Sequence, residues 1–596
     1  MTVERASMED EDLLLLRAFE PVVRLTQGEF FMPVGVDEYV RHASLWRVGS
    51  QGDMERVTDV GELDLDELAR RGRELDGPGY SLSGISVPHS RRDRVRSWFK
   101  TERPKFRAGN RLGEVGITGR AIDTLSRTSL LVRGAVPGGS AVASLALQNA
   151  YLEPDRPKYH GRVLRDNGWI VCQYWYFYSF NNWRSGFSGV NEHESDWEQV
   201  TIFLDGTGLV DDDGLPEPRW VVFSAHDETG DDLRRRWDDP DLSLVDGRHP
   251  VVFAGAGSHS GAYLAGDYLI TVVPPRLGGI VPAIRRLAKV MTPWTRAAQG
   301  SGLGIPYIDY ARGDGASIGP GQEYEWTPVV IDDDVPWVRD YRGLWGHDTQ
   351  DKFGGERGPA GPRYERNATV RASWGDPVGW AGLAKVAPNP GAEMVYISGR
   401  LEDIDEELAV LDVDTARARI VLAEQAAGHA PRAPEVRALE AEERRITEAR
   451  LTAIRLRDER ARMVRAQEGG VAEVGPHAHL SHRRTPIAVS ERGRARMLSA
   501  WAVVSTPIIL LLLATIFLPG PLSGFRFVFW MLIAVLAVEA FARGYFLSYL
   551  SRLVFVLLFI NFLLLFFINW RWAIGGLFVA SAIIVLIVNI RDARRG

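Results

Sequence analysis

The residues best placed to do chemistry are an imidazole and several carboxylates that stand together in the sequence HESDWE, positions 193 to 198. If the chain is extended here, Asp196 and Glu198 share one face of a strand and Trp197 points to the other. Carboxylate oxygens and an imidazole nitrogen could bind a divalent cation. The same groups could equally serve as a general acid and a general base.

Two further histidines follow apolar runs that are typical of strands. His226 ends the run WVVFSAH, and His259 lies in the glycine-rich loop GAGSHSG after PVVFAG. We expect the ends of these strands to be neighbours, because loops at one end of a scaffold commonly form a site. The predicted divalent-cation site, for Mg²⁺ or Ca²⁺, consists of His193, Asp196, Glu198, His226 and His259. Surface charge beside a buried tryptophan is the alternative interpretation.

Other motifs and the composition exclude several classes of protein. The glycine-rich stretch GDGASIGPG at 313–321 lacks the Gly-Lys-Ser/Thr ending of a phosphate-binding loop. The single cysteine, Cys172, cannot form a disulfide within the chain, and it lies in an apolar run. A net charge of -7 and a pI near 6.0 argue against a nucleic-acid-binding protein. We find no convincing serine or cysteine nucleophile.

Short apolar runs separated by Gly, Pro and Trp turns must position these groups. They predict a β-rich, sandwich-like soluble domain over residues 1–390 of the 596-residue chain. The predicted fold class of the whole chain is α+β. The expected strands are Ala141–Leu147, Val171–Phe180, Gln199–Leu204, Arg219–Ser224, Pro250–Ala254 and Tyr268–Val273. The basic segment 277–298 is expected to be a helix that caps the sandwich or contacts a membrane surface.

The composition changes over residues 399–467, where charged residues, Ala and Leu dominate and apolar positions recur at helical spacing. This pattern predicts two antiparallel helices, 401–427 and 434–467, that form a coiled-coil-like hairpin. The hairpin is expected to be a stalk or a surface for homo-oligomers. A basic linker follows over residues 468–497.

Four apolar stretches near membrane-spanning length end the chain, at 499–518, 525–542, 553–569 and 572–590. They predict a four-span transmembrane bundle over residues 498–590. Arginines concentrate before the first stretch, in the middle connection and after the last stretch. The other two connections hold one arginine each, Arg526 and Arg571. Cytoplasmic segments carry the excess of basic residues, so both termini and the soluble domain are expected to be cytoplasmic, at the cell membrane.

Several motifs in the same order give the soluble part a resemblance to a known family. They are FEPVVRLTQGEFFMPVGVDEYV, YWYFYSFN followed by HESDWEQVTIFL, FSAHDETG and GRHPVVFAGAGSHSGAY. The chain resembles the family named for vacuolar protein sorting-associated protein 62, and three later segments look like those of bacterial members: IPYIDYARGDGASIGPGQ, YRGLWGHDTQDKFGGERGPAGP and SWGDPVGWAGL. The resemblance spans residues 17–386 and implies no established biochemical activity.

More distantly, EHESDWE is similar to the heptapeptide G-H-R-H-D-W-E of necrosis- and ethylene-inducing-like toxins. Those proteins are secreted β-sandwiches that bind a divalent cation and the sugar head group of a sphingolipid. Glu192, Glu194 and Ser195 stand where the heptapeptide has Gly, Arg and His. The matching positions are His193, Asp196, Trp197 and Glu198.

Three functions follow from these features as hypotheses. The first, which we favour, is a membrane-anchored binding module that recognises a polar head group, a glycan or a protein partner with the help of a divalent cation. The second is a metal-dependent hydrolase in which Asp196 and Glu198 hold the ion and a histidine acts as base. The third is a structural or transport-related membrane assembly.

Overall fold

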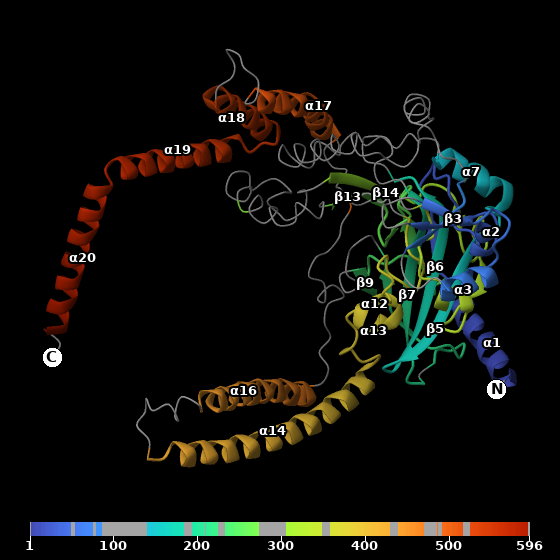
Figure 1. The fold of residues 1–596 in the computed structure, drawn as a ribbon, viewed down its shortest axis with the longest axis horizontal. Coiled ribbons are helices and arrows are strands. Elements are labelled where there is room, and N and C mark those ends of the chain that lie inside the picture. Colours follow the sequence, from blue (N-terminus) through green and yellow to red (C-terminus); the bar gives the residue numbers. More distant parts are fainter. Residues whose placement is uncertain are drawn as a thin grey trace.

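The computed structural model describes most of the chain (Figure 1). The described residues are 2–48, 54–74, 79–85, 140–183, 193–208, 210–224, 233–272, 286, 305–347, 358–428, 439–469, 486, 492–515 and 525–593. Within them the protein is a mixed α/β structure with several sheets, which confirms the predicted fold class in its coarse outline. Segment 277–298, apart from residue 286, and His226 lie outside this part.

A six-stranded sheet forms the centre of the fold, in the order β16-β5-β6-β7-β8-β9. Its two longest strands, β6 and β7, are antiparallel, and nearly every residue in them is buried. Both faces of this sheet are therefore covered, which agrees with the nearly continuous apolar and aromatic residues of β6. In β7 the residues His193 to Asp196 are polar and are buried as well. The strands are β5 (Lys158–Asp166), β6 (Trp169–Asn181), β7 (His193–Asp205), β8 (Pro218–Phe223), β9 (Arg234–Arg236) and β16 (Thr327–Val330).

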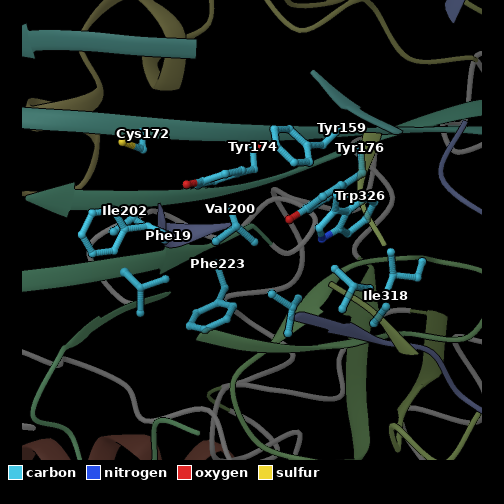
Figure 2. Packing of buried hydrophobic residues seen from close by; sticks show 14 of the residues in the cluster. Phe19, Tyr159, Cys172, Tyr174, Tyr176, Val200, Ile202, Phe223, Ile318 and Trp326 are labelled. Carbon is cyan, nitrogen blue, oxygen red and sulfur yellow. The ribbon is translucent and has the colours of Figure 1, made fainter. Parts of the chain in front are cut away.

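A smaller sheet covers one face, in the order β10-β11-β1-β15 with β12 beside β11. Side chains of both sheets meet in one apolar core, so the two sheets pack face to face. Figure 2 shows Tyr174, Tyr176, Val200 and Phe223 of the central sheet on one side and Ile318 of the smaller sheet on the other. The strands are β1 (Val22–Arg24), β10 (Leu244–Val245), β11 (His249–Ala254), β12 (Gly261–Ala262) and β15 (Ser317–Ile318).

The opposite face of the central sheet is covered by short helices, loops and the three-stranded sheet β3-β2-β4. Tryptophans dominate this second core, which includes Trp175 and Trp197 from the central sheet. The covering elements are α2 (Val36–Arg41), β2 (Ser44–Val48), β3 (Met54–Thr58), α3 (Leu65–Glu74), β4 (Tyr80–Ser83), α11 (Pro336–Asp340) and α12 (Ala372–Gly375). The remaining elements of this region are α1 (Thr2–Phe19), α7 (Ser140–Tyr151), β13 (Gly266–Val272), β14 (Ile305–Ala311) and α13 (Pro377–Trp380).

The predicted strand at 141–147 is wrong, because this segment lies inside helix α7. The buried residues of α7 are Ser140, Ser144 and Gln148, which recur every four residues and so lie on one helical face. Ser144 donates a hydrogen bond to the carbonyl oxygen of Ser179 at 3.1 Å. A helix whose buried face is polar gives no hydrophobic period, which is why the sequence pattern was misleading.

Two long helices, α14 (Pro390–Ala426) and α16 (Glu440–Gly469), lie side by side as the predicted hairpin (Figure 1). Apolar positions such as Ile397, Ile404, Ala453 and Leu456 are buried between them. Ion pairs connect the helices on the outside. They are Arg400–Glu459 at 3.1 Å, Arg457–Asp412 at 2.7 Å and Arg460–Asp405 at 2.5 Å.

Four helices follow: α17 (Arg492–Ala514), α18 (Phe525–Ala542), α19 (Phe546–Ile568) and α20 (Trp570–Ala593). Within the described residues, two segments are long and apolar enough to cross a membrane, Phe546–Leu565 and Trp570–Arg591. The apolar parts of α17 and α18 are shorter, at Ala500–Ile509 and Phe527–Ala542. Membrane association therefore has support from two helices, and the predicted four-span bundle is not confirmed.

Candidate functional site

From Asp196 onward, the side chains of β7 alternate as predicted from the sequence. Asp196 and Glu198 pair in register with Tyr178 and Tyr176 of β6, and both acids face the smaller sheet. Trp197 points to the opposite face and packs in the tryptophan-rich core. The prediction for these three residues is confirmed, and it places two carboxylates at one end of the sandwich.

His259 reaches this end from the loop that follows β11. Its Nδ1 lies 3.0 Å from Oδ2 of Asp196, which also accepts a hydrogen bond from Asn181 at 3.0 Å. On its other side, Nε2 of His259 lies 3.7 Å from Oε1 of Glu29. The imidazole stacks on the ring of Tyr178, with 3.8 Å between the ring centroids. His259 is thus held between two carboxylates on an aromatic surface.

The electrostatics favour a charged imidazole in this position. Burial alone would lower the pKa of His259, but the hydrogen bond with Asp196 and the negative charges of Asp196 and Glu29 outweigh it and raise the pKa to about 9. Burial, the largest single effect, raises the pKa of the two carboxyl groups, yet their interactions with His259 and with neighbouring donors together lower the pKa of each below its ordinary value. The three groups therefore form a buried ion triad, carboxylate–imidazolium–carboxylate, at neutral pH.

Glu198 differs from Asp196 in its charge state. Ser224 donates a hydrogen bond to its Oε2 at 2.6 Å. Burial first, and then the nearby charge of Asp196, raise the pKa of Glu198 well above its usual range. A neutral carboxyl group beside an ion triad can donate a hydrogen bond as well as accept one.

A small cavity of about 10 Å³ lies beside these groups. It is lined by Glu198, His259, Tyr176, Tyr178 and apolar residues of β1, β7 and β11. The hydroxyl group of Tyr176 is buried and has no hydrogen-bond partner among the described residues. Pockets for drug-sized ligands measure roughly 300–1,000 Å³, whereas this cavity has room for about one water-sized polar group.

Glu29 is a site residue that the sequence analysis missed. Strands β1 and β11 are parallel, with Arg24 opposite Phe253, so the residues that follow each strand lie at the same edge of the sheet. Glu29 follows β1 and His259 follows β11, and Glu29 accepts a hydrogen bond from the backbone N–H of Gly257 at 2.6 Å. Only the pairing of these distant strands reveals this contact.

The first residues of β7 behave differently from the prediction. His193 is buried, its Nδ1 lies 2.8 Å from the carbonyl oxygen of Ser195, and burial lowers its pKa. Glu194 points to the other face of the sheet, where it contacts Tyr39 and Ser83. Ser195 has φ +58°, in the left-handed region, and this conformation interrupts the alternation of the strand.

Ser195 and His259 (φ +55°) both adopt the left-handed conformation that favours glycine, and both lie at this site. Such backbone strain in residues other than glycine concentrates at functional sites, because the surrounding structure must hold it in place. The strain is therefore independent support for the interpretation of this end of the sandwich as a site.

The predicted cation site is brought together in part. Asp196, Glu198 and His259 meet, His193 begins the same strand, and His226 lies outside the described part. Among described residues, no group of three or more His, Cys, Asp or Glu side chains is arranged to hold a metal ion. Asp196 and His259 are instead bonded to each other. The divalent cation stays a prediction.

Comparison of the chain with family models, curated proteins and solved structures gives no match. The resemblance to the vacuolar protein sorting-associated protein 62 family stays a prediction.

Proposed function

We propose that this protein is a membrane-anchored binding module that recognises a polar head group or glycan at the cavity beside Glu198 and His259. The observation that carries the proposal is the buried ion triad of Asp196, His259 and Glu29 next to a small cavity, where the hydroxyl of Tyr176 has no hydrogen-bond partner among the described residues. Two helices able to cross a membrane would anchor the module. The small cavity would take the polar tip of a larger ligand.

Binding is favoured over hydrolysis by the state of the histidine. A general base needs a neutral nitrogen that can accept a proton from its substrate. In His259 both nitrogens face carboxylates and the imidazole is charged at neutral pH, so it is not available as a base. The triad is better suited to fixing the shape of the site and to presenting the side chains of Glu198 and Tyr176.

For the test, the full chain is reconstituted in proteoliposomes, and the measured quantity is the number of fluorescent vesicles that these proteoliposomes capture. The vesicles contain phosphatidylcholine alone or with one added lipid, which is phosphatidylserine, phosphatidylinositol or a glycolipid. We expect one added head group to increase capture, and Glu198→Gln combined with Tyr176→Phe to reduce that increase about tenfold. Glu55→Gln, on an exposed strand away from the cavity, is the control.

Addition of a chelator tests whether recognition requires a divalent cation. Capture that is lost with chelator and restored by Mg²⁺ or Ca²⁺ would support a cation at Asp196 and Glu198, whereas unchanged capture would support recognition by hydrogen bonds alone. Equal capture of all vesicles by wild type and variant would contradict the binding module. Release of a cleaved head group, detected by mass spectrometry, would favour the hydrolase.

We further propose that α17 and α18 cross the membrane together with α19 and α20, with the sandwich in the cytoplasm. The arginine distribution supports this orientation. An impermeant thiol reagent applied to intact cells should then label Ser523→Cys and Asn569→Cys, and it should label Tyr545→Cys only after lysis. The only natural cysteine, Cys172, is buried and provides the unlabelled background. Labelling of Tyr545→Cys in intact cells would contradict the proposal.

A further inference from the structure

A second group of polar atoms lies on the face of the central sheet opposite the cavity. These atoms are buried and have no hydrogen-bond partner within the described residues. Their side chains are at most 7% exposed. They include the indole Nε1 atoms of Trp175, Trp197 and Trp345, Oε1 of Gln199 and Oγ1 of Thr201, and both ring nitrogens of His160, beside Trp197, belong to the same group.

The side chains are neighbours. Trp175 of β6 and Gln199 of β7 are partners in register, so they stand side by side on one face. Trp197 and Thr201 lie two residues before and after Gln199 and share that face. The ring of Trp345, from the covering loop, is 5.4 Å from the ring of Trp197. The unpartnered atoms therefore belong to one cluster.

Such a cluster needs an explanation, because nearly all buried polar groups in native proteins have a hydrogen-bond partner. The indole N–H groups can only donate, the amide oxygen of Gln199 can only accept, and the hydroxyl of Thr201 can do both. A matching molecule must accept several hydrogen bonds and donate at least one. Ether and hydroxyl oxygens together meet this requirement.

The charges on this face indicate that the molecule is neutral. Arg162 lies in the same part of the sheet, and its guanidinium group is already bonded to Asp333 at 2.5 Å and to the carbonyl oxygen of Trp374 at 2.8 Å. The guanidinium group of Arg162 is therefore already paired and offers little attraction to an anion. Aromatic rings, by contrast, offer apolar faces to the C–H groups of a sugar or polyol.

We propose that this tryptophan-rich face binds a neutral polyhydroxylated molecule, a sugar or polyol unit, between the central sheet and its covering loops. The indole N–H groups donate to its oxygens, and Gln199 accepts from one of its hydroxyl groups. This site is separate from the cavity beside Glu198 and does not depend on it.

The test is calorimetric titration of the full chain, in a detergent that contains no sugar, with myo-inositol and with methyl α-glucoside. We expect at least one of these probes to bind. Trp345→Phe and Trp175→Phe retain an aromatic ring and lose only the N–H donor and the second ring, so each should weaken binding about fivefold. The control is Trp169→Phe, whose N–H is bonded to the carbonyl oxygen of Val386 at 3.2 Å, and it should leave the affinity unchanged.

Two results would overturn the proposal. In the first, neither probe gives heat of binding at high millimolar concentration, and Trp345→Phe and Trp169→Phe lose the same amount of stability. That result would mean that internal water molecules satisfy the indole groups. The other is an unchanged affinity in Trp345→Phe and Trp175→Phe. Glu198→Gln should retain binding, which keeps this test independent of the cavity.

Discussion

Replacement of Glu194 by alanine is expected to lower the free energy of unfolding by about 3–5 kcal/mol, because it leaves several buried hydrogen-bond donors without their acceptor. Glu194 is 2% exposed. Its carboxylate connects β7 to Ser83 of β4 and to the backbone of His347. Its donors are Tyr39 Oη at 3.1 Å, Ser83 Oγ at 2.9 Å and the backbone N–H groups of Gly84 at 2.5 Å, Ile85 at 3.1 Å and His347 at 3.0 Å.

The measurement is urea unfolding of the full chain in detergent, followed by tryptophan fluorescence. Glu194→Gln should cost less than Glu194→Ala, because the amide keeps one accepting oxygen. Glu55→Ala removes an exposed carboxylate that has a single partner, Arg47, and it should leave stability nearly unchanged. If Glu194→Ala were as stable as Glu55→Ala, the network around Glu194 would not hold these segments together.

The role of Glu194 also shows where the sequence pattern stops being informative. Strand periodicity correctly placed Asp196 and Glu198 on one face and Trp197 on the other. The same periodicity would put Glu194 with Asp196, and it fails because Ser195 adopts the left-handed conformation. The sequence HESDWE gives no sign that Ser195 adopts this conformation, because glycine is the residue that usually does so.

Long-range pairing is the second feature that periodicity could not reveal. The hairpin α14–α16 and three of the six strands of the central sheet, β6, β7 and β8, follow from local patterns, and the structure has them close to their predicted positions. The contact of His259 with Glu29 depends on the parallel pairing of β1 with β11, although the two strands are far apart in the chain. Which distant strands meet is decided by packing of the whole sandwich, so the candidate site could be predicted only in part.

The ion triad leads to the second large effect, a loss of stability at alkaline pH. The pKa of His259 rises from its ordinary value of 6.5 to about 9 in the folded protein. A raised pKa stabilises the folded state fully below the unfolded pKa, and this contribution is lost as pH rises from 6.5 through 9. The linkage amounts to about 3 kcal/mol, because one pKa unit corresponds to about 1.4 kcal/mol. The lowered pKa values of Glu29 and Asp196 act on the acid side, where stability is lost as pH falls below their unfolded values.

Unfolding of wild type and His259→Asn should therefore be compared between pH 5 and 10, since asparagine tolerates the left-handed conformation and carries no charge. The difference in free energy of unfolding should be largest near pH 6 and should shrink steadily toward pH 9. His193→Asn is the matched control: burial lowers the pKa of His193, so its effect should appear on the acid side of pH 6.5. Parallel curves for wild type and His259→Asn from pH 6 to 9 would mean that His259 is neutral in the folded protein, and the site would then contain a histidine able to act as a base.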